Sequence, residues 1–285
     1  MSALDRWREQ LESWRIPASI LEAAPETPWG FPAELFRRRA AEATGTDPGA
    51  APTVGRAAEA LPRGGSVLDV GCGGGATSMA LADRAGSVVG VDGQADMLEA
   101  FLEAAAAAGV RAKTVQGPWP AVAPEAGLAD VVVCGHVLYN VADAAPFVDA
   151  LNRHARRRVV LELTDRHPLV WMRDLWERFH GVERPSGPTA EDAVSAIREI
   201  GPEPHREERS AGDDHPAGGG FERREDAVAL VRRRLCLPSS RDPEVEAALG
   251  DRLRERDGLW SAGSARQRLV TLWWDVDPPD PPTPG

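Results

Sequence analysis

Short apolar runs alternate with amphipathic segments through the middle of the chain. The runs are rich in β-branched residues, which is typical of buried strands that end in tight turns. The sequence predicts five strands, over residues 66–70, 87–91, 110–115, 129–134 and 157–163. Helices are predicted between them, over residues 76–85 and 94–109 and from Asp143 onward. This alternation predicts an α/β fold, in which a doubly wound parallel sheet is covered by helices on both faces.

The remaining segments are predicted to be additions to this sheet. Residues 1–48 carry many aromatic residues among charges and are predicted to form a helical cap, or lid. The sheet domain is expected over 49–276, with helical insertions at 166–188 and 222–258 and a disordered proline-rich tail at 277–285. An arginine run at 232–234 is expected on a solvated helix face.

Composition and charge narrow the classes of protein that the chain can represent. A net charge of −11 argues against DNA or an anionic membrane as a partner and disfavours RNA. No apolar run approaches the roughly 20 residues that span a bilayer, and the N-terminus lacks a signal-peptide pattern, so a cytoplasmic protein is expected. The three cysteines are widely spaced and match neither a disulfide framework nor a zinc pattern, so no metal is predicted.

The stretch VLDVGCGGGATS, residues 67–78, places an acid and four glycines where a strand enters a helix. A glycine turn at this point lets a ligand approach the backbone amides closely. Asp92 follows Gly71 by 21 residues, so a dinucleotide fingerprint is formally met. Asp69 favours a different ligand, because its carboxylate would repel a pyrophosphate and attract the sulfonium and ammonium groups of S-adenosylmethionine. The residues therefore favour a cationic nucleoside ligand.

Three segments resemble the class I S-adenosylmethionine-dependent methyltransferases. VLDVGCGGGATS resembles the first motif of that family, VVGVDGQADML (88–98) its ribose-binding segment, and ADVVVCGHVLYNV (129–141) its fourth strand and the following loop. The resemblance implies a mostly parallel, Rossmann-like sheet. It also implies that residues 266–276 form the antiparallel last strand.

The resemblance assigns cofactor-binding residues. Asp69, Gly71 and Gly73 would surround the methionine part of the cofactor, Asp92 would bind the ribose, and Cys134 would border the site. Asp69 as a cap of the turn and Asp92 as a cap of the helix near residue 94 are the alternatives.

The sequence departs from the family after the third strand. The family often has an acid there that faces the adenine, whereas this chain has Gln116-Gly117-Pro118-Trp119. Adenine would then be held by backbone groups, as at Gly117, and by apolar contact with Trp119. Packing of Trp119 on the helix below is an equal alternative.

The loop after the fourth strand supplies the candidates for catalysis. Methyl transfer is a direct displacement at carbon, so the enzyme mainly aligns the nucleophile and excludes water. His136 is the first candidate for a general base, and Tyr139 and Asn140 could orient the acceptor. A polar loop spacer is the alternative for His136, and packing is the alternative for the other two. His167 is a weaker second base.

The sequence thus predicts methyl transfer from S-adenosylmethionine to a small-molecule acceptor, leaving S-adenosylhomocysteine. Oxygen is preferred over nitrogen as the acceptor atom, because His136 could remove a proton. An RNA or protein methyltransferase stays open because of the arginine runs at 156–158 and 232–234. A non-catalytic protein that binds S-adenosylmethionine is the third hypothesis.

Overall fold

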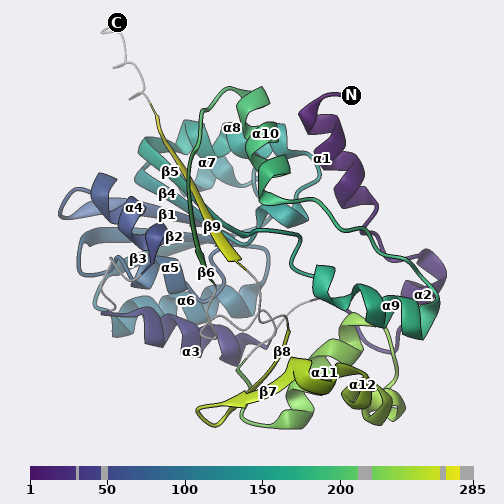
Figure 1. Ribbon diagram of the computed structural model, residues 1–285. Helices are drawn as coiled ribbons and strands as arrows, with labels where there is room; N and C mark the ends of the chain where they lie inside the picture. Colours follow the sequence, from purple (N-terminus) through teal and green to yellow (C-terminus); the bar gives the residue numbers. More distant parts are fainter. Residues whose placement is uncertain (30–31, 46–50, 211–219, 264–267, 277–285) are drawn as a thin grey trace, which may run out of the picture.

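A seven-stranded sheet forms the centre of the computed structural model (Figure 1). The structure describes residues 1–29, 32–45, 51–210, 220–263 and 268–276. The strands of the sheet are β1 (Gly65–Val70), β2 (Ala85–Asp92), β3 (Arg111–Gln116), β4 (Ala129–Gly135), β5 (Ala155–Thr164), β6 (His205–Ser210) and β9 (Arg268–Asp275). All five strands predicted from the apolar runs are present, with ends that differ by one or two residues.

The strand order is β3-β2-β1-β4-β5-β9-β6. Strands β1 to β5 pair in parallel, and β9 runs antiparallel to both β5 and β6. The predicted α/β fold with an antiparallel last strand is therefore confirmed. Alternation along β1 sends Leu68 and Val70 into one core and Val67 into the core on the opposite face, so the sheet is buried on both sides.

Helices cover both faces of the sheet. They are α4 (Pro52–Ala60), α5 (Ala76–Met79), α6 (Ala95–Ala107), α7 (Ala123–Ala126), α8 (Ala144–His154) and α10 (Ala190–Ile200). Helix α10 begins at a capping box in which Thr189 and Asp192 exchange hydrogen bonds. Helix α5 is shorter than the predicted 76–85, because the chain must turn within five residues to enter β2 at Ala85.

The N-terminal segment contains α1 (Ala3–Glu12), α2 (Ala18–Glu22) and α3 (Ala33–Ala43). Helix α1 packs against α10 and α8, and its Trp7 is fully buried in the main core. The Trp7 indole donates to the carbonyl of Val141 at 2.8 Å. This part of the predicted lid therefore belongs to the core of the sheet domain. Helix α3 packs on α5 and α6, and the predicted boundary at residue 48 lies outside the described residues.

A second cluster of elements lies to one side of the sheet (Figure 1). It contains α9 (Arg173–His180), α11 (Arg224–Arg234), α12 (Asp242–Leu249), and the hairpin of β7 (Leu253–Arg256) and β8 (Leu259–Ala262). The prediction of a purely helical insertion over 222–258 was therefore wrong at its end. Asp257 and Gly258 both have positive φ, and an Asp-Gly pair of this kind favours a tight hairpin turn.

The arginine run on α11 also differs from its prediction. Arg232 is buried rather than solvated, and it pairs with Glu26 and Asp242. Short 3-10 helices complete the description: η2 (Leu138–Asn140), η3 (Val170–Met172), η4 (Ser239–Arg241) and η5 (Gly250–Arg252). Across the described ranges, no helix is both long and apolar enough to cross a membrane. The tail predicted as disordered, 277–285, lies outside those ranges.

Candidate active site

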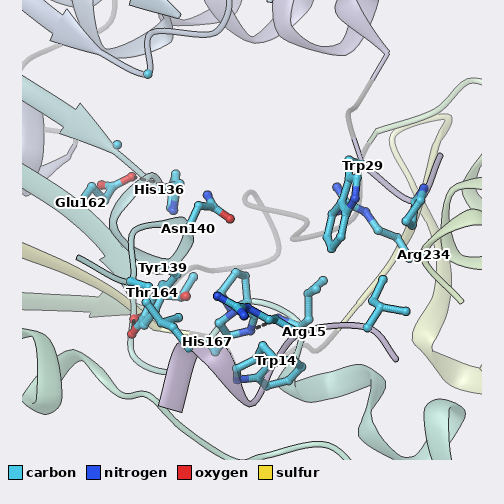
Figure 2. Close-up of a pocket in the computed structure, with 18 of the residues that line it drawn as sticks. Trp14, Arg15, Trp29, His136, Tyr139, Asn140, Glu162, Thr164, His167 and Arg234 are labelled. Atoms are coloured by element: carbon cyan, nitrogen blue, oxygen red, sulfur yellow. Dashed lines mark hydrogen bonds and ion pairs between the residues drawn. The ribbon is translucent and has the colours of Figure 1, made fainter. Parts of the chain in front are cut away.

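A cavity of about 770 Å³ lies at the carboxyl ends of β1, β4 and β5. This is the edge where ligands bind in open α/β sheets. Its opposite walls come from the N-terminal segment and from the cluster around α9 and α11. Figure 2 shows Glu162 and His136 on one side, Trp29 and Arg234 on the opposite side, and Trp14 and His167 along the lower edge.

The glycine turn follows β1 and forms part of the floor. Gly71, Gly73 and Gly75 all have positive φ, between +50° and +87°, which only glycine adopts without strain. A Cβ on Gly71 would overlap Val137, and one on Gly73 would lie 2.8 Å from the ring of Phe36. A residue with a side chain would therefore not fit at Gly71 or Gly73. In this structure the space next to these glycines is taken by the side chains of Val137 and Phe36.

Asp69 is the second-last residue of β1, two residues before the glycine turn begins, and is buried. Burial raises the pKa of its carboxyl group to about 7, and Asp92 adds to the rise, whereas a hydrogen bond from the Ser78 hydroxyl opposes it. Among the described residues, no basic side chain pairs with Asp69. The cavity therefore contains a buried carboxylate that a cationic ligand would stabilise.

Asp92 connects the glycine turn to the helix that follows β2. Its carboxylate accepts hydrogen bonds from the amides of Gly73 and Gln94, each at 3.0 Å, and Gln94 is the cap residue of α6. The hydrogen bond from the Gln94 amide lies at the start of α6, where the alternative role of Asp92 as a helix cap places it. Asp92 does not line the cavity, so its ribose-binding role stays a prediction.

His136 and Glu162 form a pair at the sheet side of the cavity. His136 follows β4 with a φ of +61°, a conformation that is strained for a residue with a side chain. Its backbone amide donates to the carbonyl of Glu162 at 2.7 Å, and its Nε2 lies 3.1 Å from Glu162 Oε1. The pair therefore holds the imidazole in one orientation, with Nε2 toward the carboxylate and Nδ1 as the nitrogen that accepts a proton.

Further hydrogen bonds fix Glu162 itself. The Thr53 hydroxyl on α4 lies 2.6 Å from Glu162 Oε2 and 2.7 Å from the hydroxyl of Thr271 on β9. Sequence reasoning missed Glu162, although a single acid within the apolar run of β5 is a usable signal. Carboxylates are rarely buried in a central strand unless they have a specific partner.

Tyr139 lines the cavity, but its hydroxyl donates to the carbonyl of Thr164 at 2.8 Å. Burial raises the pKa of the phenol, and its ring stacks on Trp7 at 5.6 Å between centroids. These contacts agree with the packing alternative, and the catalytic role of Tyr139 stays a prediction. Asn140 is exposed and points into the cavity beside His136 (Figure 2).

Three predicted cofactor residues lie away from the cavity. Cys134 is buried in the sheet core, where burial raises the pKa of its thiol, so it does not border the site as predicted. The Trp119 indole donates to the carbonyl of Phe147 at 3.2 Å and packs on α8, which is the alternative left open for it. Gly117 has a φ of +148° and donates to the carbonyl of Asp92 at 3.0 Å. Contacts of Gly117 and Trp119 with adenine stay predictions.

His167 forms part of an aromatic wall. Its ring stacks on Trp14 with 3.9 Å between centroids, and its Nδ1 accepts a hydrogen bond from the amide of Leu169. Burial, together with the nearby charge of Arg184, lowers the pKa of His167 to about 3. The ring is therefore neutral near pH 7 and contributes surface rather than proton transfer.

Comparison with known proteins identifies the central segment. Residues 67–158 match a family described as a methyltransferase domain, which confirms for this segment the family predicted from its motifs. An O-methyltransferase of ubiquinone biosynthesis from Pseudomonas paraeruginosa is 37% identical over 116 residues, or 38% of this chain. The match covers 48% of that protein, so the chain spans about half the length of the curated relatives it matches.

Solved structures support the same fold. A cyclopropane-fatty-acyl-phospholipid synthase-like protein from Lactobacillus casei gives a TM-score of 0.52 at 14% identity, over 93% of this chain and 99% of that chain. A protein described as a putative methyltransferase, from Bacillus halodurans, gives a TM-score of 0.50 at 18% identity, over 79% of this chain and 99% of that chain. At this identity the likeness concerns the fold alone.

Proposed function

We propose that this chain, whose residues 67–158 match a methyltransferase domain, transfers a methyl group from S-adenosylmethionine to a hydroxyl oxygen of a small molecule. One observation carries the proposal. The glycine turn with Asp69 and the His136–Glu162 pair face a single cavity at the carboxyl ends of the strands. The cavity therefore contains both a carboxylate that attracts a cation and a base that can remove a proton. Methyl transfer from a sulfonium group to a hydroxyl oxygen can use both.

The residues around Asp69 fit the methionine end of the cofactor. When bound, S-adenosylmethionine supplies a methyl group on a positively charged sulfur, and a buried carboxylate without a basic partner suits that charge. Asp69, Gly71 and Gly73 would hold this end, and Asp92 would hold the ribose. Phe36 of α3 now contacts Gly73, so the nucleoside requires this ring to shift, which gives α3 the role of a lid.

His136 acts as the general base. It would accept the proton of the acceptor hydroxyl, so the imidazole would become an imidazolium. Glu162 stabilises that positive charge at 3.1 Å, and Thr53 keeps the carboxylate in place. Asn140 lies beside the histidine and can accept or donate a hydrogen bond to the acceptor.

The shape of the cavity favours a small acceptor over RNA or a protein. Residues from the N-terminal segment, among them Trp14 and Trp29, close the side opposite the sheet. The similar protein from Pseudomonas is an O-methyltransferase, which supports oxygen as the acceptor atom. A cytoplasmic location stays a prediction.

Two measurements test the proposal. Calorimetry should detect binding of S-adenosylmethionine and S-adenosylhomocysteine but not of NADH, and Asp69→Asn should weaken the interaction with the sulfonium compound more than with its neutral product. Mass spectrometry should then find a labelled methyl group on an oxygen of a small molecule, after incubation with methyl-labelled cofactor and metabolite pools. Binding of NADH without the sulfonium compound would overturn the proposal, and cofactor binding without any turnover would support the non-catalytic hypothesis.

A further inference from the structure

Four arginines line the cavity on the walls that do not belong to the sheet: Arg15, Arg39, Arg184 and Arg234. Most of the acids that line the cavity lie on the sheet. Asp69 and Glu162 come from strands, and the third, Glu12, pairs with Arg15 at 3.3 Å. In Figure 2 Arg234 faces His136 and Glu162 across the cavity. The cavity is therefore acidic at the sheet and basic at the cap, within a protein of net charge −11.

Arg184 is the most deeply buried member of this set, with only 4% of its surface exposed. Its terminal nitrogens donate to the backbone carbonyls of Trp14 and Arg15. The rings of Trp14 and Trp176 lie 5.1 and 4.7 Å from the guanidinium carbon. Its Nε is buried and has no hydrogen-bond partner, and no acid of the described residues pairs with it. Burial of a cation without a counter-ion costs free energy, so an anion bound in the cavity would stabilise Arg184.

Arg232 is a second buried arginine in the same cluster of elements, and its surroundings differ from those of Arg184. It is as deeply buried as Arg184, at 5%, but it does not line the cavity. Two carboxylates, those of Glu26 and Asp242, pair with it. Among the residues that the structure describes, acids therefore pair with the arginine away from the cavity, and none pairs with the arginine that lines it.

The neighbouring arginines strengthen the positive potential. Burial lowers the pKa of Arg234 to about 10, and the charge of Arg233 adds to the effect. Burial also lowers the pKa of Arg39, and Arg38 adds to it. Both side chains still carry their charge at pH 7, and Glu42 offsets part of the charge of Arg39, so the two arginines add positive potential to that made by Arg184.

We propose that the arginine end of the cavity binds a carboxylate group of the acceptor, so that the substrate is a hydroxylated small-molecule acid with an apolar, flat body. Guanidinium groups bind carboxylates through paired hydrogen bonds. The Trp14–His167 stack and Trp29 supply the surface for the body, and the hydroxyl reaches His136 at the other end. This inference rests on the proposed function, because it takes the histidine end as the place of methyl transfer.

The experiment compares acids with neutral counterparts of the same shape. Protocatechuate, caffeate and salicylate are titrated against the full chain by calorimetry, each beside its primary amide, with S-adenosylhomocysteine present and absent. The variants are Arg184→Gln, Arg234→Gln and Arg39→Gln, with Arg234→Lys as the conservative change. Arg223→Gln is the matched control, because it removes one exposed charge at the start of the same helix without changing the cavity lining.

At least one acid should bind about tenfold or more tightly than its amide, as expected for a charge-assisted hydrogen bond in a buried place. Arg234→Gln and Arg39→Gln should remove most of that preference, Arg234→Lys should keep part of it, and Arg223→Gln should keep all of it. If Arg184→Gln fails to fold, the other two variants still decide the question. Equal affinity for every acid and its amide, or an equal loss for both in the variants, would overturn the inference.

The two proposals fail separately. Loss of the acid preference in a chain that methylates neutral acceptors would refute the anion site and leave the methyltransferase function intact. Acid binding that depends on the arginines, in a chain that binds no S-adenosylmethionine, would refute the function and support the anion site.

Discussion

Replacement of Glu162 by glutamine tests the catalytic pair most sharply, because it removes a charge and keeps the shape. Glu162 lies 3.1 Å from the Nε2 of His136, and its side chain is only 14% exposed. The carboxylate matters most when the imidazole becomes positively charged, which happens as the acceptor loses its proton. Glu162→Gln should therefore slow the transfer step and leave cofactor affinity nearly unchanged.

The geometry sets the expected size of the effect. Two unit charges 3.1 Å apart attract by about 5 kcal/mol at an effective dielectric constant of about 20, and by about 1.3 kcal/mol in bulk water. The imidazole side chain is 39% exposed, so solvent screening places the value in the lower part of this interval, at about 1.5–3 kcal/mol. That energy corresponds to a loss of about 10- to 150-fold in rate. His136→Ala, which removes the base itself, should cost about 10²–10⁴-fold.

Single-turnover methylation of an acceptor, measured from about pH 5 to 9, distinguishes a base from a positioning group. The rate of the parent enzyme should depend on pH when a side chain accepts the proton of the acceptor, and His136→Ala should lose that dependence. His154→Ala is the matched control, since that histidine bonds to the carbonyl of Ala150 on α8, outside the cavity. A loss below about tenfold in His136→Ala would refute the reasoning. The acceptor would then be nucleophilic without a base, as a free amine is, and the preference for oxygen would fail.

Three further predictions follow from buried groups. Affinity for S-adenosylmethionine should fall as pH drops below about 7, because protonated Asp69 no longer attracts a cation, and calorimetry of Asp69→Asn should show a flat profile. Trp7→Ala should lower the free energy of unfolding by about 3–5 kcal/mol in a urea titration, since a fully buried indole leaves a cavity. Cys72 and Cys134 should resist maleimide in the native protein, because burial raises the pKa of both thiols, and mass spectrometry should detect their labelling only after unfolding.

The fold could be predicted because strand and helix periods are local properties of the chain. Four of the five parallel strands were signalled by an apolar run next to a turn, whereas β3 is partly polar. The β7–β8 hairpin was missed because β7 follows a strongly helical segment and is only four residues long. The Asp257–Gly258 pair was the available signal, and it has the backbone angles of a hairpin turn.

The site was only partly predictable, for a different reason. Asp69 is the second-last residue of β1 and His136 directly follows β4, so the topology of the sheet fixes the position of both. Tyr139 was assigned to catalysis because its sequence position resembles that of His136, but the direction of its side chain depends on Thr164 and Trp7, which lie far away in the sequence. The lining arginines come from four separate segments, so no local pattern could reveal that they share one cavity.

The charge distribution of the cavity would orient both the methyl donor and the acceptor, and so it connects the proposed function with the proposed anion site. A cationic donor and an anionic acceptor would each be attracted to one end, and each would be repelled from the other. The His136–Glu162 pair stands at the acidic end, where it adds to the attraction of the donor and removes the proton of the acceptor. Because the chain fixes both ends, the distance between the acid group and the hydroxyl of the acceptor decides which oxygen reaches the methyl carbon. Alignment of this kind is the main contribution that a protein makes to a displacement whose leaving group is already good.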